Sequence, residues 1–177
     1  MGAVRPFVPS RLVMGLLSTG EESHPELFSL LTRAFGPILE MSEAVPFTFT
    51  DYYDQEMGST PMRSFLVFER LYDPALLADA KLITNRIEER FSLKGGRTIN
   101  LDPGLLSAPN LILATTKNRS HRIPLKEGIY AEVTLTYEKG RFHALPWTYA
   151  DYGSEPFRLL FKRYRSDYMV AIRALET

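Results

Sequence analysis

Apolar positions at strand and helix spacing divide the first half of the chain into alternating elements. Residues 12–17 form a short apolar run, which predicts a buried strand. Between Pro25 and Gly36 the apolar positions recur at helical spacing, and proline suits the first turn of a helix while glycine suits its end. Residues 38–49 then return to an extended pattern. The pattern therefore opens as strand, helix, strand.

The second half continues with a strand, a helix and a run of further strands. Residues 64–69 predict a strand, and Asp73 followed by Pro74 predicts a helix that begins there and runs to about residue 92. The remaining elements are strands at 97–101 and 110–116 on either side of a turn at Asp102-Pro103-Gly104, strands at 121–125, 129–137 and 141–146, and a last helix capped by Ser154.

The predicted fold class is α+β with an antiparallel sheet. The first six elements follow the order β-α-β-β-α-β, which is the ferredoxin-like split pattern and would place both helices on one face of the sheet. The later strands form a β-meander that extends that sheet or packs against it, and a C-terminal helix follows. With 177 residues and no evident linker or repeat, we expect a single domain over residues 1–177.

Composition removes several kinds of chemistry. The chain has no cysteine, so disulfides, thiolate nucleophiles and cysteine-ligated metal sites are excluded. The first 20 residues contain neither a signal peptide pattern nor an apolar run that could span a membrane, so we expect a cytoplasmic protein without a membrane partner. Lysine plus arginine and aspartate plus glutamate both number 21, which makes a nucleic-acid partner unexpected on total charge.

One polar cluster stands out as a candidate site. It combines Asp102 and Glu132 with the basic segment that carries Lys117, His121 and Arg122. If the two predicted turns converge at one edge of the sheet, Lys117 and Arg122 would clamp an anionic ligand. His121, Asp102 and Glu132 would then supply acid–base groups. The alternative is structural: Asp-Pro-Gly forms turns without any ligand, and Arg122 with Glu132 would make a cross-strand ion pair.

Two further segments could form the walls of such a site. Asp51 and Tyr53 lie in a polar, turn-rich loop, and Trp147 lies in an aromatic block before the last helix. A hydrated loop and an aromatic block that packs against the core are the ordinary alternatives. The three histidines follow no metal-ligand spacing, so no metal residue is predicted, and the sequence defines no cofactor.

Blocks of residues in a fixed order resemble those of a known family. They are Phe49-Thr50-Asp51-Tyr52-Tyr53, Asn100-Leu101-Asp102-Pro103-Gly104, Leu113-Ala114-Thr115-Thr116-Lys117, Tyr130-Ala131-Glu132-Val133-Thr134-Leu135 and Pro146-Trp147-Thr148-Tyr149. The chain resembles the bacterial family called domain of unknown function 4416 over nearly its whole length. Some members carry the label GTP-binding protein. Residues Gly15 to Gly20 have the glycine spacing of a phosphate loop, but Glu21-Glu22 replaces its Lys-Ser/Thr, which argues against that label.

Two functions of different classes therefore stand as hypotheses. The first is the binding of an anionic or nucleotide-like small molecule through the Asp/Lys/His/Arg cluster. The second is a non-catalytic adaptor that binds RNA or protein, since Arg158, Lys162 and Arg165 follow one face of the last helix. An ordinary amphipathic helix also shows a charged outer face, so this stripe alone does not decide between them.

Overall fold

The computed structural model describes residues 2–19, 25–49, 57, 60–93 and 96–175. Within them, nine strands form one antiparallel sheet in which seven follow the order β11-β10-β8-β7-β1-β4-β2. Two short strands, β3 (Val45–Pro46) and β9 (Ile123–Pro124), pair with β4 and β10. A separate hairpin joins β5 (Ser92–Leu93) to β6 (Gly96–Arg97). The predicted α+β class with an antiparallel sheet is confirmed.

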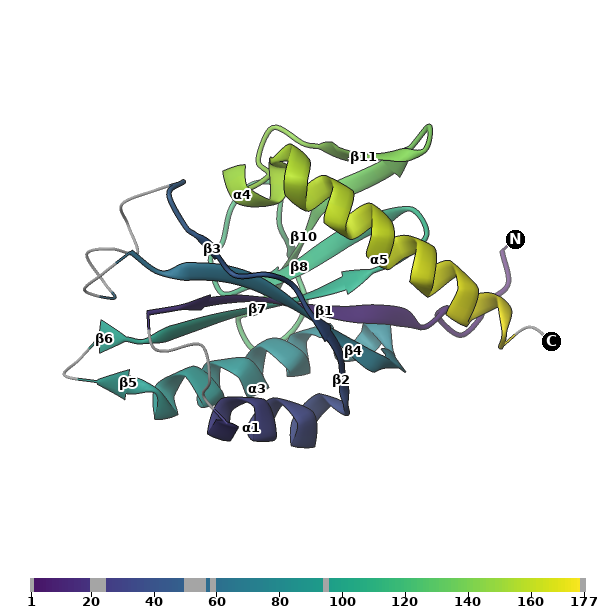
Figure 1. Ribbon diagram of the computed structural model, residues 1–177. Coiled ribbons are helices and arrows are strands. Elements are labelled where there is room, and N and C mark those ends of the chain that lie inside the picture. The colour runs from purple at the N-terminus through teal and green to yellow at the C-terminus, as the bar shows by residue number, and fades with distance from the viewer. Residues whose placement is uncertain (1, 20–24, 50–56, 58–59, 94–95, 176–177) are drawn as a thin grey trace.

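The first half of the chain builds one side of the sheet and the helices beneath it. Its elements are β1 (Ser10–Ser18), α1 (Pro25–Phe35), β2 (Ile38–Met41), β4 (Met62–Tyr72), α3 (Leu77–Arg90) and β7 (Ile99–Leu106). Figure 1 shows α1 and α3 side by side on one face of the sheet. The order β7-β1-β4-β2 agrees with a split β-α-β arrangement, while the ferredoxin-like classification stays a prediction.

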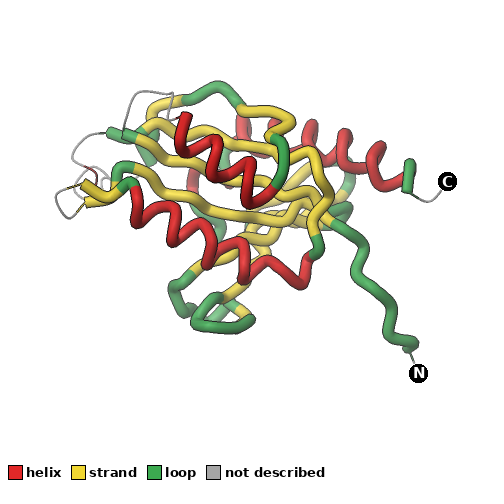
Figure 2. The backbone as a smooth tube through the Cα atoms, turned by 90° about the horizontal axis from the view of Figure 1, so that it is seen from below, coloured by secondary structure: helices red, strands yellow, loops and turns green. Residues whose placement is uncertain are grey.

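The meander extends the sheet on the far side of β7, which is the first of the two expected arrangements. It consists of β8 (Asn110–Thr115), β10 (Tyr130–Glu138) and β11 (Arg141–Ala144). The short helix α4 (Ala150–Gly153) and the long helix α5 (Glu155–Arg173) cover the face opposite α1 and α3 (Figures 1 and 2). The sheet thus separates two apolar cores, one beneath α1 and α3 and one beneath α4 and α5.

Asp73 caps the start of the second helical segment, as its sequence context predicts. Asp73 adopts an extended backbone and its side chain accepts a hydrogen bond from the backbone N–H of Ala75, 2.9 Å away. Pro74 occupies the first turn of the short 3-10 helix Pro74–Leu76, which leads into α3. The predicted N-cap is confirmed.

The predicted turn at Asp102-Pro103-Gly104 is wrong. These residues lie inside β7, all eight residues of which pair with β1. Long-range pairing therefore overrides the local turn preference of the Asp-Pro-Gly sequence. Proline is tolerated because β7 pairs with β8 only over Gly104–Leu106, so the strand has a single neighbour at Pro103.

Other predicted boundaries also shift around the meander. The strand expected at 121–125 is limited to Ile123–Pro124, and His121 and Arg122 lie in the turn before it. The backbone N–H of Arg122 donates to the carbonyl of Arg119 across that turn, 3.0 Å away. Ser154 lies at the N-cap of α5, as predicted, but its side chain makes no capping hydrogen bond, and α4 ends just before it.

Candidate functional site: a polar pocket where two strands separate

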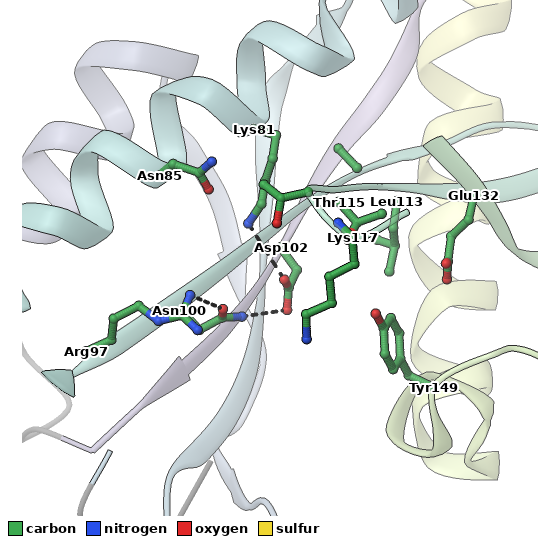
Figure 3. Close-up of a pocket in the computed structure, with 12 residues that line it drawn as sticks. Lys81, Asn85, Arg97, Asn100, Asp102, Leu113, Thr115, Lys117, Glu132 and Tyr149 are labelled. Carbon is green, nitrogen blue, oxygen red and sulfur yellow. Dashed lines mark hydrogen bonds and ion pairs between the residues drawn. The ribbon is translucent and has the colours of Figure 1, made fainter. Parts of the chain in front are cut away.

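Strands β7 and β8 stop pairing partway along their length, and a polar pocket lies between them where they separate. The two strands pair over Gly104–Leu106 and Leu111–Leu113, after which β8 continues along β10 alone. The resulting cavity has a volume of about 100 Å³. Its walls, most of which Figure 3 labels, are Lys81, Asn85, Arg97, Asn100, Asp102, Leu113, Ala114, Thr115, Thr116, Lys117, Glu132 and Tyr149.

Side chains from α3 take the place of the missing strand along β7. Lys81 Nζ donates to the carbonyl of Leu101 at 2.7 Å, and the backbone N–H of Leu101 donates to Glu88 Oε1 at 2.8 Å. Both side chains are buried. The backbone N–H and carbonyl of Leu101, which β8 does not pair, are therefore satisfied by α3, and this lowers the cost of separating the strands.

A chain of hydrogen bonds then leads along β7 to Asp102. Arg97 Nη1 donates to Glu88 Oε2 at 2.9 Å and to Asn100 Oδ1 at 3.2 Å. Asn100 Nδ2 donates in turn to Asp102 Oδ2 at 2.9 Å. The other carboxylate oxygen, Oδ1, lies 4.0 Å from Lys81 Nζ. Figure 3 shows the contacts of Arg97 with Asn100, of Asn100 with Asp102 and of Asp102 with Lys81.

Arg63 supports Asp102 from the α4 side of the sheet. Its Nη1 lies 3.5 Å from Asp102 Oδ2, and its Nη2 lies 2.8 Å from Asp151 Oδ2. Burial raises the pKa of Asp151, and the nearby Arg63 guanidinium acts in the opposite direction. Aromatic rings surround the guanidinium, with the centroids of Phe47 and Tyr152 at 5.3 and 5.6 Å. Arg63 therefore links β4 to β7 and to α4 through buried ion pairs.

Gly15 on β1 provides the space for this contact. It pairs with Asp102 on one side and with Phe65 on the other, so it lies between β4 and β7. A Cβ atom at position 15 would lie 2.4 Å from the Tyr152 hydroxyl and 3.0 Å from Arg63 Nη1. Glycine is needed here for close approach rather than for an unusual backbone angle.

Glu132 forms the opposite wall, and its carboxylate is paired with basic side chains on the side away from the cavity. Its Oε2 accepts from Arg122 Nε at 2.6 Å and lies 3.2 Å from His121 Nε2. Burial acts to lower the pKa of Arg122, but the hydrogen bond to Glu132 and nearby negative groups raise it overall. Arg122 Nη2 also donates to the Tyr149 hydroxyl at 2.9 Å. Burial raises the pKa of Tyr149, although Arg122 opposes that shift, so this phenol keeps its proton.

The structure brings together three of the residues predicted for the site: Asp102, Lys117 and Glu132 line the pocket. His121 and Arg122 contact Glu132 from outside it. The Arg122–Glu132 ion pair, which the structural alternative predicted, is present, although Arg122 lies before β9 and not within a strand. Trp147 stacks on His121 with ring centroids 4.8 Å apart and donates to the carbonyl of Val133, so it packs behind Glu132. Asp51 and Tyr53 lie outside the described residues.

Several residues that line the pocket or support its wall were not predicted from the sequence. Lys81 follows Leu77 by four positions and so falls within the apolar stripe of its helix, and Glu88 follows Thr84 in the same way. A charge on the buried face of a helix was the signal that could have found them. Asn100, by contrast, gave no such signal, because its role depends on the separation of β7 from β8.

The basic face of α5 serves packing at two of its three positions. Arg158 Nη1 donates to the carbonyl of Phe142 at 3.3 Å, and Arg165 Nε donates to the carbonyl of Ala108 at 2.7 Å. The Arg165 guanidinium also lies 3.7 Å from the ring centroid of Tyr137. These contacts join α5 to the sheet, as an ordinary amphipathic helix would be joined.

Two other features of the described residues bear on function. No set of three or more histidine, aspartate or glutamate side chains within them is arranged to hold a metal ion. Within the same residues, no helix combines the length and the apolar character that crossing a membrane would require.

Fold and pocket together define an α+β protein whose polar site lies where a large antiparallel sheet separates. The model of one family, Domain of unknown function (DUF4416), matches residues 8–168. The chain belongs to this family. No curated protein and no solved structure matches the chain.

Proposed function

We propose that the protein binds a small anionic molecule in the pocket between β7 and β8. The observation that carries the proposal is the convergence of three cationic side chains on one cavity. Lys81 comes from α3, Arg97 from β6 and Lys117 from the end of β8. Only two carboxylates, Asp102 and Glu132, line the same cavity. Glu88 pairs with Lys81 and Arg97 from behind the cavity, Arg122 pairs with Glu132, and Arg63 pairs with Asp102 and Asp151. Among the described residues, five cationic side chains therefore face four carboxylates, and this surplus of one positive charge favours an anion.

The size of the cavity limits what enters it. A volume of about 100 Å³ is well below the roughly 300–1,000 Å³ typical of sites for drug-sized ligands. A phosphate or carboxylate group fits such a space, whereas a whole nucleotide does not. A nucleotide-like ligand would therefore insert only an anionic group. We also propose that the protein is cytoplasmic, as expected from the sequence. In the cytoplasm the pocket would have access to small anionic metabolites.

Lys117 is the residue whose loss tests this proposal most cleanly. It is exposed, and Figure 3 shows its side chain extending into the space between Asp102 and Tyr149. Replacing it with glutamine is expected to weaken anion binding by roughly tenfold to a hundredfold, because a hydrogen bond to a charged group contributes about 1.5–3 kcal/mol. Folding should change little.

Thermal unfolding in increasing sodium phosphate measures the effect. At a concentration of about 100 times the Kd, a bound anion adds about 2.7 kcal/mol of stability, which raises the Tm of a chain of this size by roughly 5–10 °C. Lys162→Gln, an exposed lysine on α5, is the matched control and should respond to phosphate like the wild type. Equal responses of Lys117→Gln and the wild type would refute the proposal.

A further inference from the structure

We infer that the pocket selects an oxyanion that still carries a proton, with inorganic phosphate as the ligand. This inference rests on the proposed function and narrows it. It starts from a feature that a general anion site would avoid: a carboxylate, Asp102, faces the cavity together with the lysines and arginine.

The Asp102 carboxylate is held in place mainly through one of its two oxygens. Both hydrogen bonds that described side chains donate to it, from Asn100 and Arg63, fall on Oδ2. Oδ1 lies on the side of Lys81, 4.0 Å from its Nζ. The side chain as a whole is 25% exposed, far more than Glu132 or Asp151. Oδ1 is therefore placed to accept a hydrogen bond from a bound molecule.

An acceptor in this position discriminates between oxyanions of the same shape. At neutral pH inorganic phosphate retains at least one proton, whereas sulfate retains none. Phosphate can donate its O–H to Asp102 Oδ1 while its other oxygens accept from the surrounding cations. Sulfate would instead place an oxygen lone pair against the carboxylate, which is an uncompensated repulsion in a confined site. A phosphate monoester above its pKa of about 6 has also lost its proton and meets the same repulsion.

The remaining walls supply the donors that such an anion needs. The Tyr149 hydroxyl accepts a hydrogen bond from Arg122, so its own O–H can donate to an oxygen of a bound anion. Asn85 and Lys117 line the pocket from two further sides. The pocket thus offers several hydrogen-bond donors and one acceptor, Asp102 Oδ1. Hydrogen phosphate matches this arrangement, because it has several acceptor oxygens and a single proton to donate.

Isothermal titration calorimetry of the full chain, at constant ionic strength and pH 7.5, tests the inference with sodium phosphate, sodium sulfate and glycerol 3-phosphate. The wild type is expected to bind phosphate at least about tenfold more tightly than sulfate, with glycerol 3-phosphate closer to sulfate. Asp102→Asn, which replaces the acceptor oxygen or offers an N–H donor, should bring the phosphate-to-sulfate ratio to about one or below. Asp79→Asn, at a half-buried carboxylate of α3 that pairs with Lys126 and does not line the pocket, is the control and should keep the wild-type ratio.

The outcomes separate the inference from the function on which it rests. Equal affinity of the wild type for phosphate and sulfate would overturn the selectivity and leave small-anion binding intact. Tighter binding of glycerol 3-phosphate than of phosphate would overturn the inorganic ligand in favour of a phosphate ester. If neither phosphate nor sulfate binds, both the inference and the proposed function fail. The wild-type ratios alone decide these cases, even if Asp102→Asn does not fold.

Discussion

Replacing Arg63 with methionine is expected to lower the free energy of unfolding by about 3–5 kcal/mol. The guanidinium is buried and lies 2.8 Å from Asp151 Oδ2 and 3.5 Å from Asp102 Oδ2. Removing it would leave Asp151, only 2% exposed, without its positive partner in a place where burial already raises the pKa of its carboxyl group. Urea unfolding followed by circular dichroism measures the change.

A double substitution separates the ion pair from the loss of packing. Arg63→Met combined with Asp151→Leu removes both buried charges, and such replacements are often neutral or stabilising relative to a broken pair. The double variant should therefore be more stable than Arg63→Met alone. A cost below about 1 kcal/mol for the single variant, or no recovery in the double variant, would contradict the role given to Arg63.

Gly15→Ala is the substitution with the second largest expected effect, a loss of about 1–3 kcal/mol. The new methyl group would lie 2.4 Å from the hydroxyl of Tyr152, which is 2% exposed. Because β1 pairs on both sides, neither the strand nor the helix α4 can shift without disturbing other contacts. Chemical denaturation with the same probe measures the loss.

The Tyr152→Phe background shows whether this hydroxyl is the cause. Phenylalanine lacks the oxygen atom that the new methyl group would meet, so Gly15→Ala should cost clearly less stability in this background than in the wild type. Gly153→Ala is a useful control, because its nearest neighbours would lie at ordinary contact distances of 3.5 and 3.6 Å. An equal cost in both backgrounds would mean that the strain lies elsewhere.

Sequence periodicity predicts much of this fold. The helix from Pro25 to Phe35 follows its apolar spacing and its proline, and Asp73 caps the next helical segment as expected. The strands predicted at 110–116, 129–137 and 141–146 are also found, as β8, β10 and β11. Local rules fail at Asp102-Pro103-Gly104, where pairing of the whole of β7 with β1 outweighs the turn preference of three residues.

The candidate site is less accessible from the sequence, for a physical reason. Asp102, Lys117 and Glu132 were predicted to converge, and they line one pocket. They were expected to meet at turns along an edge, however, and they meet where two neighbouring strands separate inside the sheet. That separation depends on Lys81 and Glu88, which satisfy the backbone of Leu101 from another element. The sequence around Leu101 contains no pattern that indicates the separation of β7 from β8.

The same separation explains why charged residues gather here. Strands that diverge leave backbone groups that need polar partners, and buried charges from α3 meet that need. Lys81, which donates to the carbonyl of Leu101, also lines the pocket. Lys81 thus has a structural role in the sheet as well as the binding role proposed for it, whereas Lys117 lines the pocket from an exposed position.

A crystal structure of the protein grown with millimolar phosphate tests the central claim most directly. The account predicts a tetrahedral anion between β7 and β8, within hydrogen-bonding distance of Asp102 Oδ1 and Lys117 Nζ. An empty pocket in crystals that hold phosphate elsewhere, for example on the arginines along α1 and α3, would contradict it.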